Sequence, residues 1–91
     1  GFENYVLKQN SDGFTLVGYL GTESRVVLNT KVGDKGTVTE IGEYAFYNCT
    51  SLLNITVERA EGSVTVGKKW FPTMNGKEIK ELKITWSENA S

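Results

Sequence analysis

Residues that could carry out chemistry are few in this chain. Its 91 residues include no histidine and a single cysteine, Cys49. Without histidine there is no imidazole to serve as a general base, a zinc ligand or the partner of a nucleophile. One cysteine alone forms neither an internal disulfide nor a thiolate metal cluster. We therefore expect no catalytic, cofactor-binding or metal-binding residues, and no enzyme activity.

Two features of the sequence could indicate a chemical role, and for each of them we expect a structural role instead. Cys49 has no arginine near it in the sequence to lower its thiol pKa, and its spacing places it on a buried face. The stretch "GDKG", residues 33–36, is too short for a phosphate-binding loop and lacks the serine or threonine that follows such a loop. We expect a core cysteine and a turn.

Charge and hydropathy exclude two broad classes of function. Lysine and arginine number 10, aspartate and glutamate number 11, and the net charge is −1. No basic cluster is present to neutralise phosphates, so nucleic-acid binding is not expected. No apolar run reaches the roughly 20 residues of a membrane helix, so membrane insertion is not expected. Because the chain starts at Gly1 without a methionine, we expect a fragment of a larger chain.

The N-terminal third has the pattern of short strands. "NYVLK" and "FTLVGYL" are rich in β-branched and aromatic residues, and the Asp12-Gly13 pair between them suits a tight turn. This pattern predicts a β-hairpin, followed by a third strand at "RVVLN", residues 25–29.

The next segment changes its period. Ile41, Ala45 and Cys49 are spaced four residues apart, and Phe46 extends the same face, which predicts a two-turn helix with these side chains buried. After Thr50 the period becomes two, which predicts a strand through residues 53–57.

The same pattern recurs 25 residues later. Ile41-Gly42 aligns with Val66-Gly67, and Ala45-Phe46 aligns with Trp70-Phe71. "NITV" at 54–57 then corresponds to "ELKI" at 81–84. Pro72 disfavours a helix interior, so this copy predicts a short or irregular helix followed by a turn at "MNGKE". A period in the twenties is typical of solenoids built from stacked units.

The stretch "VTEIGEYAFYNCTSLLNITV", residues 38–57, resembles a repeat of the BspA-like leucine-rich type, found in surface and secreted bacterial proteins. The segment before it resembles the leader of such arrays. The resemblance implies an α+β, β-rich fold, namely a short leucine-rich-repeat-like solenoid of about two strand–helix units. We expect a single domain, 1–91: a β-hairpin cap and incomplete first unit (1–37), one repeat (38–63), and a degenerate repeat with a C-terminal cap (64–91).

The resemblance also implies a function. The chain would be a non-enzymatic interaction or adhesion module of a cell-surface or secreted protein, binding an extracellular protein or glycan through the exposed strand face. Strand parity places these residues of the predicted partner-binding face outward: Arg25, Asn29, Asn54, Thr56, Glu58, Glu81, Lys83 and Thr85. Two alternatives stay open, a carbohydrate-binding module that presents Trp70 or Trp86, and a purely structural spacer.

Overall fold

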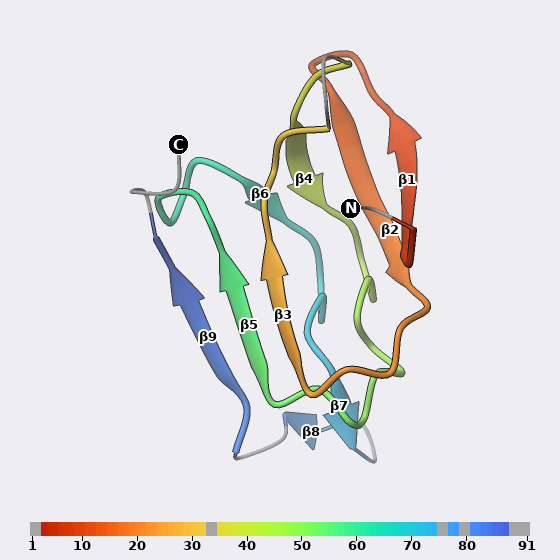
Figure 1. The fold of residues 1–91 in the computed structure, drawn as a ribbon, viewed down its shortest axis with the longest axis vertical. Helices are drawn as coiled ribbons and strands as arrows, with labels where there is room; N and C mark the ends of the chain where they lie inside the picture. The colour runs from red at the N-terminus through yellow and green to blue at the C-terminus, as the bar shows by residue number, and fades with distance from the viewer. Residues whose placement is uncertain (1–2, 33–34, 75–76, 79–80, 88–91) are drawn as a thin grey trace.

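The computed structural model describes residues 3–32, 35–74, 77–78 and 81–87. These residues form two larger sheets and one small hairpin (Figure 1). The four-strand sheet has the order β1-β2-β4-β6, the three-strand sheet has the order β3-β5-β9, and β7 pairs with β8. The strands are β1 (Tyr5–Gln9), β2 (Phe14–Tyr19), β3 (Arg25–Leu28), β4 (Val38–Ile41), β5 (Asn54–Val57), β6 (Thr65–Val66), β7 (Thr73–Met74), β8 (Lys77–Glu78) and β9 (Lys83–Trp86).

The chain passes alternately between the two larger sheets and so winds into coils (Figure 1). Coil one is β2 followed by β3, coil two is β4 followed by β5, and coil three is β6 followed by β9. All pairing between successive coils is parallel, in both sheets. This arrangement is a solenoid in which each coil contacts its neighbours. The predicted division into segments 1–37, 38–63 and 64–91 stays a prediction.

The predicted N-terminal hairpin is confirmed. β1 lies antiparallel to β2 at the edge of the four-strand sheet. The turn is closed by the Asn10 N–H, which donates to the Gly13 carbonyl at 2.8 Å. Gly13 has a φ of +155°, and a Cβ there would collide with the Thr37 carbonyl oxygen, so only glycine fits this approach.

The helix predicted over residues 41–49 is wrong, and so is the α+β class with strand–helix units. The described residues contain strands and turns and no helix. The backbone N–H groups of Ala45, Tyr47 and Cys49 each donate to the carbonyl three residues earlier, at 3.2, 3.0 and 3.0 Å. Such bonds at every second residue close successive turns, whereas a helix requires a bond at every residue.

The alternate N–H groups explain why no helix forms. The Tyr44 N–H donates to the Lys68 carbonyl at 3.1 Å, and the Phe46 N–H donates to the Trp70 carbonyl at 2.8 Å. These amides therefore bond to coil three instead of their own segment. Tyr44 also has a φ of +59°, which a right-handed helix does not allow.

The second predicted helix is absent for the same reason. Lys69 has a φ of +46°, at the position equivalent to Tyr44, and Pro72 is fully buried beyond it. The chain then forms the β7–β8 hairpin, which the sequence pattern did not predict. Asn75 and Gly76, at the centre of the predicted "MNGKE" turn, lie outside the described residues.

The register between coils confirms one predicted correspondence and corrects another. Ile41 pairs with Val66, as the repeat predicted. In the three-strand sheet, however, Asn54 pairs with Lys83 and Val57 pairs with Trp86, so the predicted match of "NITV" with "ELKI" is wrong by two residues.

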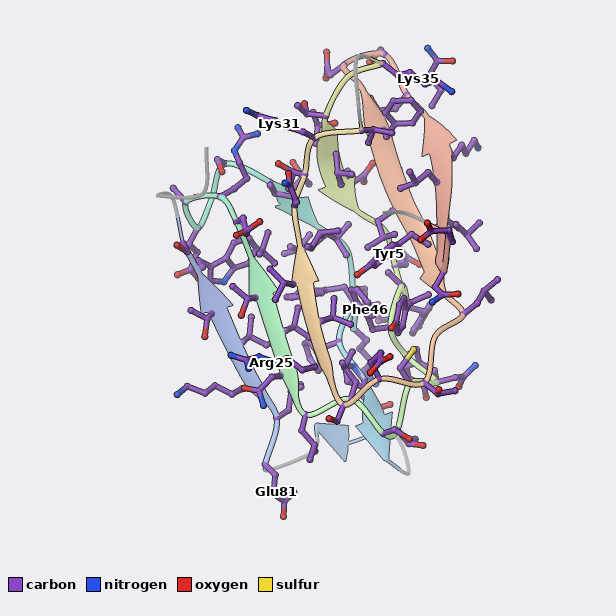
Figure 2. All side chains as sticks on the ribbon, viewed as in Figure 1. Tyr5, Arg25, Lys31, Lys35, Phe46 and Glu81 are labelled. Carbon is purple, nitrogen blue, oxygen red and sulfur yellow. The ribbon has the colours of Figure 1, made fainter. Side chains whose placement is uncertain are left out.

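The hydrophobic core lies between the two larger sheets. Phe46 is at its centre, fully buried, with its ring centroid 5.6 Å from Tyr19 and 6.3 Å from Trp70 (Figure 2). The predicted inward face of residues 41–49 is therefore confirmed even though its secondary structure is not. The buried hydrophobic residues are Leu16, Val26, Leu28, Val38, Ile41, Ala45, Phe46, Leu52, Ile55, Val57, Val64 and Trp70.

Candidate functional site

The three-strand sheet holds the predicted binding residues, and its alternation decides which side chains face out. Val26 and Leu28 of β3, and Ile55 and Val57 of β5, are buried against the core. β-branched and leucine side chains at every second position give each strand one apolar side. The intervening side chains therefore form an outward surface, which we call the outer face: Arg25, Val27, Asn54, Thr56, Lys83 and Thr85.

The parallel register aligns the outer face into two rows across the strands. Arg25, Asn54 and Lys83 are paired in sequence from β3 to β5 to β9 and form the first row. The second row, Val27, Thr56 and Thr85, follows two residues further along each strand. Thr56 is half-buried and the other five residues are exposed. The structure thus brings together five of the eight predicted residues, and with them Val27, which strand parity also places outward.

The remaining three predicted residues lie at the margins of the outer face. The Asn29 side-chain oxygen accepts a hydrogen bond from the Lys31 N–H at 3.0 Å, so this side chain closes a turn. Glu58 follows β5 and is half-buried, and its N–H donates to the Leu28 carbonyl at 3.0 Å. Glu81 precedes β9 and is exposed at one end of the molecule (Figure 2).

No described residue neutralises the two positive charges of the outer face. Neither Arg25 nor Lys83 forms an ion pair or a side-chain hydrogen bond with any described residue. Both side chains are exposed. An exposed cation without an internal partner is available to an external anion, and the energy of that contact is screened by salt.

The two tryptophans are not arranged for stacking on a sugar. Trp70 is only 6% exposed, and Trp86 is half-buried and packs against the core. Their ring centroids are 6.1 Å apart and their planes are inclined by 60°. A sugar-binding platform needs exposed, coplanar rings, so this pair does not provide one.

Cys49 carries the one thiol group of the chain. The Cys49 thiol is half-buried and donates a weak hydrogen bond to the Tyr19 carbonyl at 3.6 Å. Burial raises the pKa of this thiol, which disfavours the reactive thiolate. No group of three metal-ligating side chains occurs in the part of the chain that the structure describes. In the same part, no helix is long and apolar enough to cross a membrane.

A polar cluster on the four-strand sheet was not predicted. Asn10 donates through Nδ2 to the Thr15 hydroxyl at 2.9 Å and to the Thr39 hydroxyl at 3.1 Å. Thr15 in turn donates to Glu40 Oε1 at 2.9 Å. These bonds join β2 to β4 and hold the hairpin on coil two. The 25-residue repeat of the sequence, applied to the residues before 38, relates Thr15 to Glu40 and would have indicated that these two residues are neighbours.

Comparison with solved structures identifies the fold. The structure of a leucine-rich repeat protein from T. pallidum is similar, with a TM-score of 0.70 and 23% identity over 96% of this chain. A leucine-rich cell surface protein from Faecalibacterium prausnitzii A2-165 is also similar, with a TM-score of 0.52 and 22% identity over 74% of this chain. The fold is therefore of the leucine-rich-repeat type.

Both of these proteins are much longer than the chain described here. The chain spans 37% of the T. pallidum protein and 26% of the F. prausnitzii protein. No protein-family model matches the chain, and no curated protein is similar to it in sequence.

Proposed function

We propose that this chain is a non-enzymatic interaction module of a cell-surface or secreted bacterial protein, of the BspA-like leucine-rich type, and that it binds a protein partner through the outer face. The observation that carries the proposal is the outer face itself. It is a continuous surface of three parallel strands, with two cations that have no partner among the described residues.

The three-strand sheet is apolar on its inner side and mostly polar on its outer side, and this difference supports the proposed function. The inner side fixes the strands by burying Val26, Ile55 and Val57. The outer side chains are then free to vary in chemistry without loss of the core, and a rigid sheet presents them at fixed spacing. Surfaces of this kind in repeat proteins are extended binding surfaces.

Two likenesses support the surface or secreted location and the adhesion role. They rest on the resemblance of "VTEIGEYAFYNCTSLLNITV" to BspA-like repeats, and on the likeness to a protein described as a cell surface protein. The absence of histidine throughout the chain and the raised pKa of Cys49 agree with a module that has no catalytic role.

The proposal is tested by amide chemical-shift titration of the chain with a panel of soluble glycans and extracellular matrix proteins. We expect saturable shifts with a protein, centred on Arg25, Thr56 and Lys83. Saturable shifts confined to Trp86 with a glycan would favour the carbohydrate-binding alternative instead. Silence across the panel from a folded sample would contradict a binding function and favour a structural spacer.

A matched pair of variants separates the outer face from the rest of the surface. Thr56→Glu adds negative charge and bulk at the centre of the outer face, and we expect it to abolish the saturable shifts. Thr65→Glu makes the same change on the exposed β6 strand of the four-strand sheet and should leave them unchanged. Equal effects of both variants would contradict the assignment of the outer face.

A further inference from the structure

The two rows of the outer face contain hydrogen-bond donors and no carboxylate. The first row supplies a guanidinium, an amide and an ammonium group, from Arg25, Asn54 and Lys83. The second row adds the hydroxyl groups of Thr56 and Thr85. Such a surface matches a partner that is rich in acceptors and negatively charged.

The spacing of the two cations limits the size of that partner. Arg25 and Lys83 lie on the outer strands of the sheet, with β5 between them. Since neighbouring strands are about 4.8 Å apart, their backbones are separated by about 10 Å. Two carboxylates at alternate positions of an extended peptide are about 7 Å apart, and both reach the two flexible cationic side chains at once.

We propose that the outer face binds a short acidic peptide segment that lies across the three strands. One carboxylate pairs with Arg25 and a second with Lys83, while Asn54 donates to the segment between them. An apolar side chain of the segment packs on Val27, which is 52% exposed. This inference rests on the proposed function and specifies the chemistry of its partner.

The surroundings favour a peptide over a sulfated glycan. Two acidic residues lie at the margins of the outer face, Glu81 before β9 and Glu58 after β5. They repel a polyanion that extends beyond the two rows, and the net charge of −1 gives it no long-range attraction. The exposed Val27 side chain in the second row also suits a partner that has apolar groups.

The test uses an acetylated pentapeptide in which glutamate alternates with valine. Its matched control replaces each glutamate with glutamine. We expect the acidic peptide to produce saturable amide shifts at Arg25, Asn54 and Lys83 that weaken as salt is added, because exposed ion pairs are screened. The glutamine peptide should produce no shifts at these positions.

Two double variants locate the contact. Arg25→Gln with Lys83→Gln removes both cations of the first row, and we expect about tenfold weaker binding of the acidic peptide. Lys31→Gln with Lys35→Gln makes the same change in net charge at two exposed lysines far from Arg25 (Figure 2), and should change the affinity less than about twofold.

Each contrary result has a distinct meaning. Absence of shifts up to the solubility limit of the acidic peptide, or equal losses in the two double variants, would overturn the acidic-peptide proposal. So would tighter binding of a sulfated oligosaccharide at the same residues. If a matrix protein still shifts Thr56 in those cases, the proposed function survives and only the partner chemistry is wrong.

Discussion

Coil two and coil three follow the same positional pattern, yet their core positions differ in burial. Ile41 in β4 is fully buried, whereas Val66, its pair in β6, is 42% exposed. Ile55 and Val57 in β5 are also fully buried, while their partners in β9 are only half-buried. In a solenoid a coil is buried by its neighbours, and coil three has a described neighbour on one side only.

At the N-terminal end of the solenoid, β1 is a cap that covers coil one. β1 pairs with β2 at that end of the four-strand sheet. Tyr5 and Leu7 of β1 pack against the core, and Leu16 beneath them is fully buried. Burial in this fold therefore depends on whether a further strand covers the coil, and not on the residue type alone.

The largest expected effect is at the centre of coil two. Phe46→Ala removes the largest fully buried side chain, and we expect a loss of about 3–5 kcal/mol in the free energy of unfolding. Urea denaturation measures it. Val17→Ala, at an exposed position of β2, is the control and should change stability by less than about 0.5 kcal/mol. A loss below about 1 kcal/mol for Phe46→Ala would contradict the observed core.

One pair of substitutions tests the difference in burial between coils two and three. Ile41→Ala should cost about 2–5 kcal/mol because it opens a cavity between two coils. Val66→Ala, at the paired position of coil three, should cost less than about 1 kcal/mol because much of the side chain is already in water. Thermal or urea unfolding of both variants gives the difference. Similar losses would mean that coil three is as well covered as coil two.

The close approach of coils two and three gives a smaller effect. A Cβ on Gly67 would lie 2.5 Å from the Glu43 backbone nitrogen, so Gly67→Ala should push the two coils apart at a cost of about 1–3 kcal/mol. In Gly18→Ala the nearest atoms, on Val6, are 3.9 Å away, and we expect little change. Equal stability of the two variants in urea unfolding would show that the coils are not in close contact at Gly67.

The cap at the N-terminal end is expected to weaken in alkali. Burial raises the pKa of Tyr5 to about 12, and the neighbouring Tyr19, 5.0 Å away between ring centroids, adds to this rise. The folded state therefore retains a proton that the unfolded chain loses near pH 10, so stability is complete below pH 10 and falls as the pH rises towards 12.

Tyr5→Phe should flatten this pH dependence, as measured by unfolding between pH 9 and about 12. Part of the slope will remain, because burial also raises the pKa of Tyr19. An unchanged slope in Tyr5→Phe would show that the Tyr5 hydroxyl group does not contribute to it.

The sequence pattern predicted which side chains face the core better than it predicted the backbone. Ile41, Ala45 and Phe46 are buried as their spacing indicated. A stack of turns places residues four apart on one side just as a helix does, so periodicity did not distinguish the two. The deciding hydrogen bonds, from Tyr44 and Phe46 to coil three, join residues that are far apart in the sequence.

The outer face was predicted from parity, which is local, and this is why its rows could be identified. Arg25, Asn54 and Lys83 each alternate with apolar neighbours in their own strand. Register is not local. It depends on how the longer connection around β7 and β8 is accommodated, and the predicted alignment of β9 was wrong by two residues. An error of two residues leaves every side chain of β9 on the same side of the sheet, so the prediction of which side chains face outward was unaffected.

Amide hydrogen exchange tests the stacking of coils most directly. We expect the slowest exchange at amides between coils with neighbours on both sides, such as Gly42, whose N–H donates to the Leu16 carbonyl at 2.8 Å. The Ser87 amide, which donates to the Val57 carbonyl at 2.9 Å in coil three, should exchange faster through local opening. Equal protection of both amides would contradict coil-by-coil stacking.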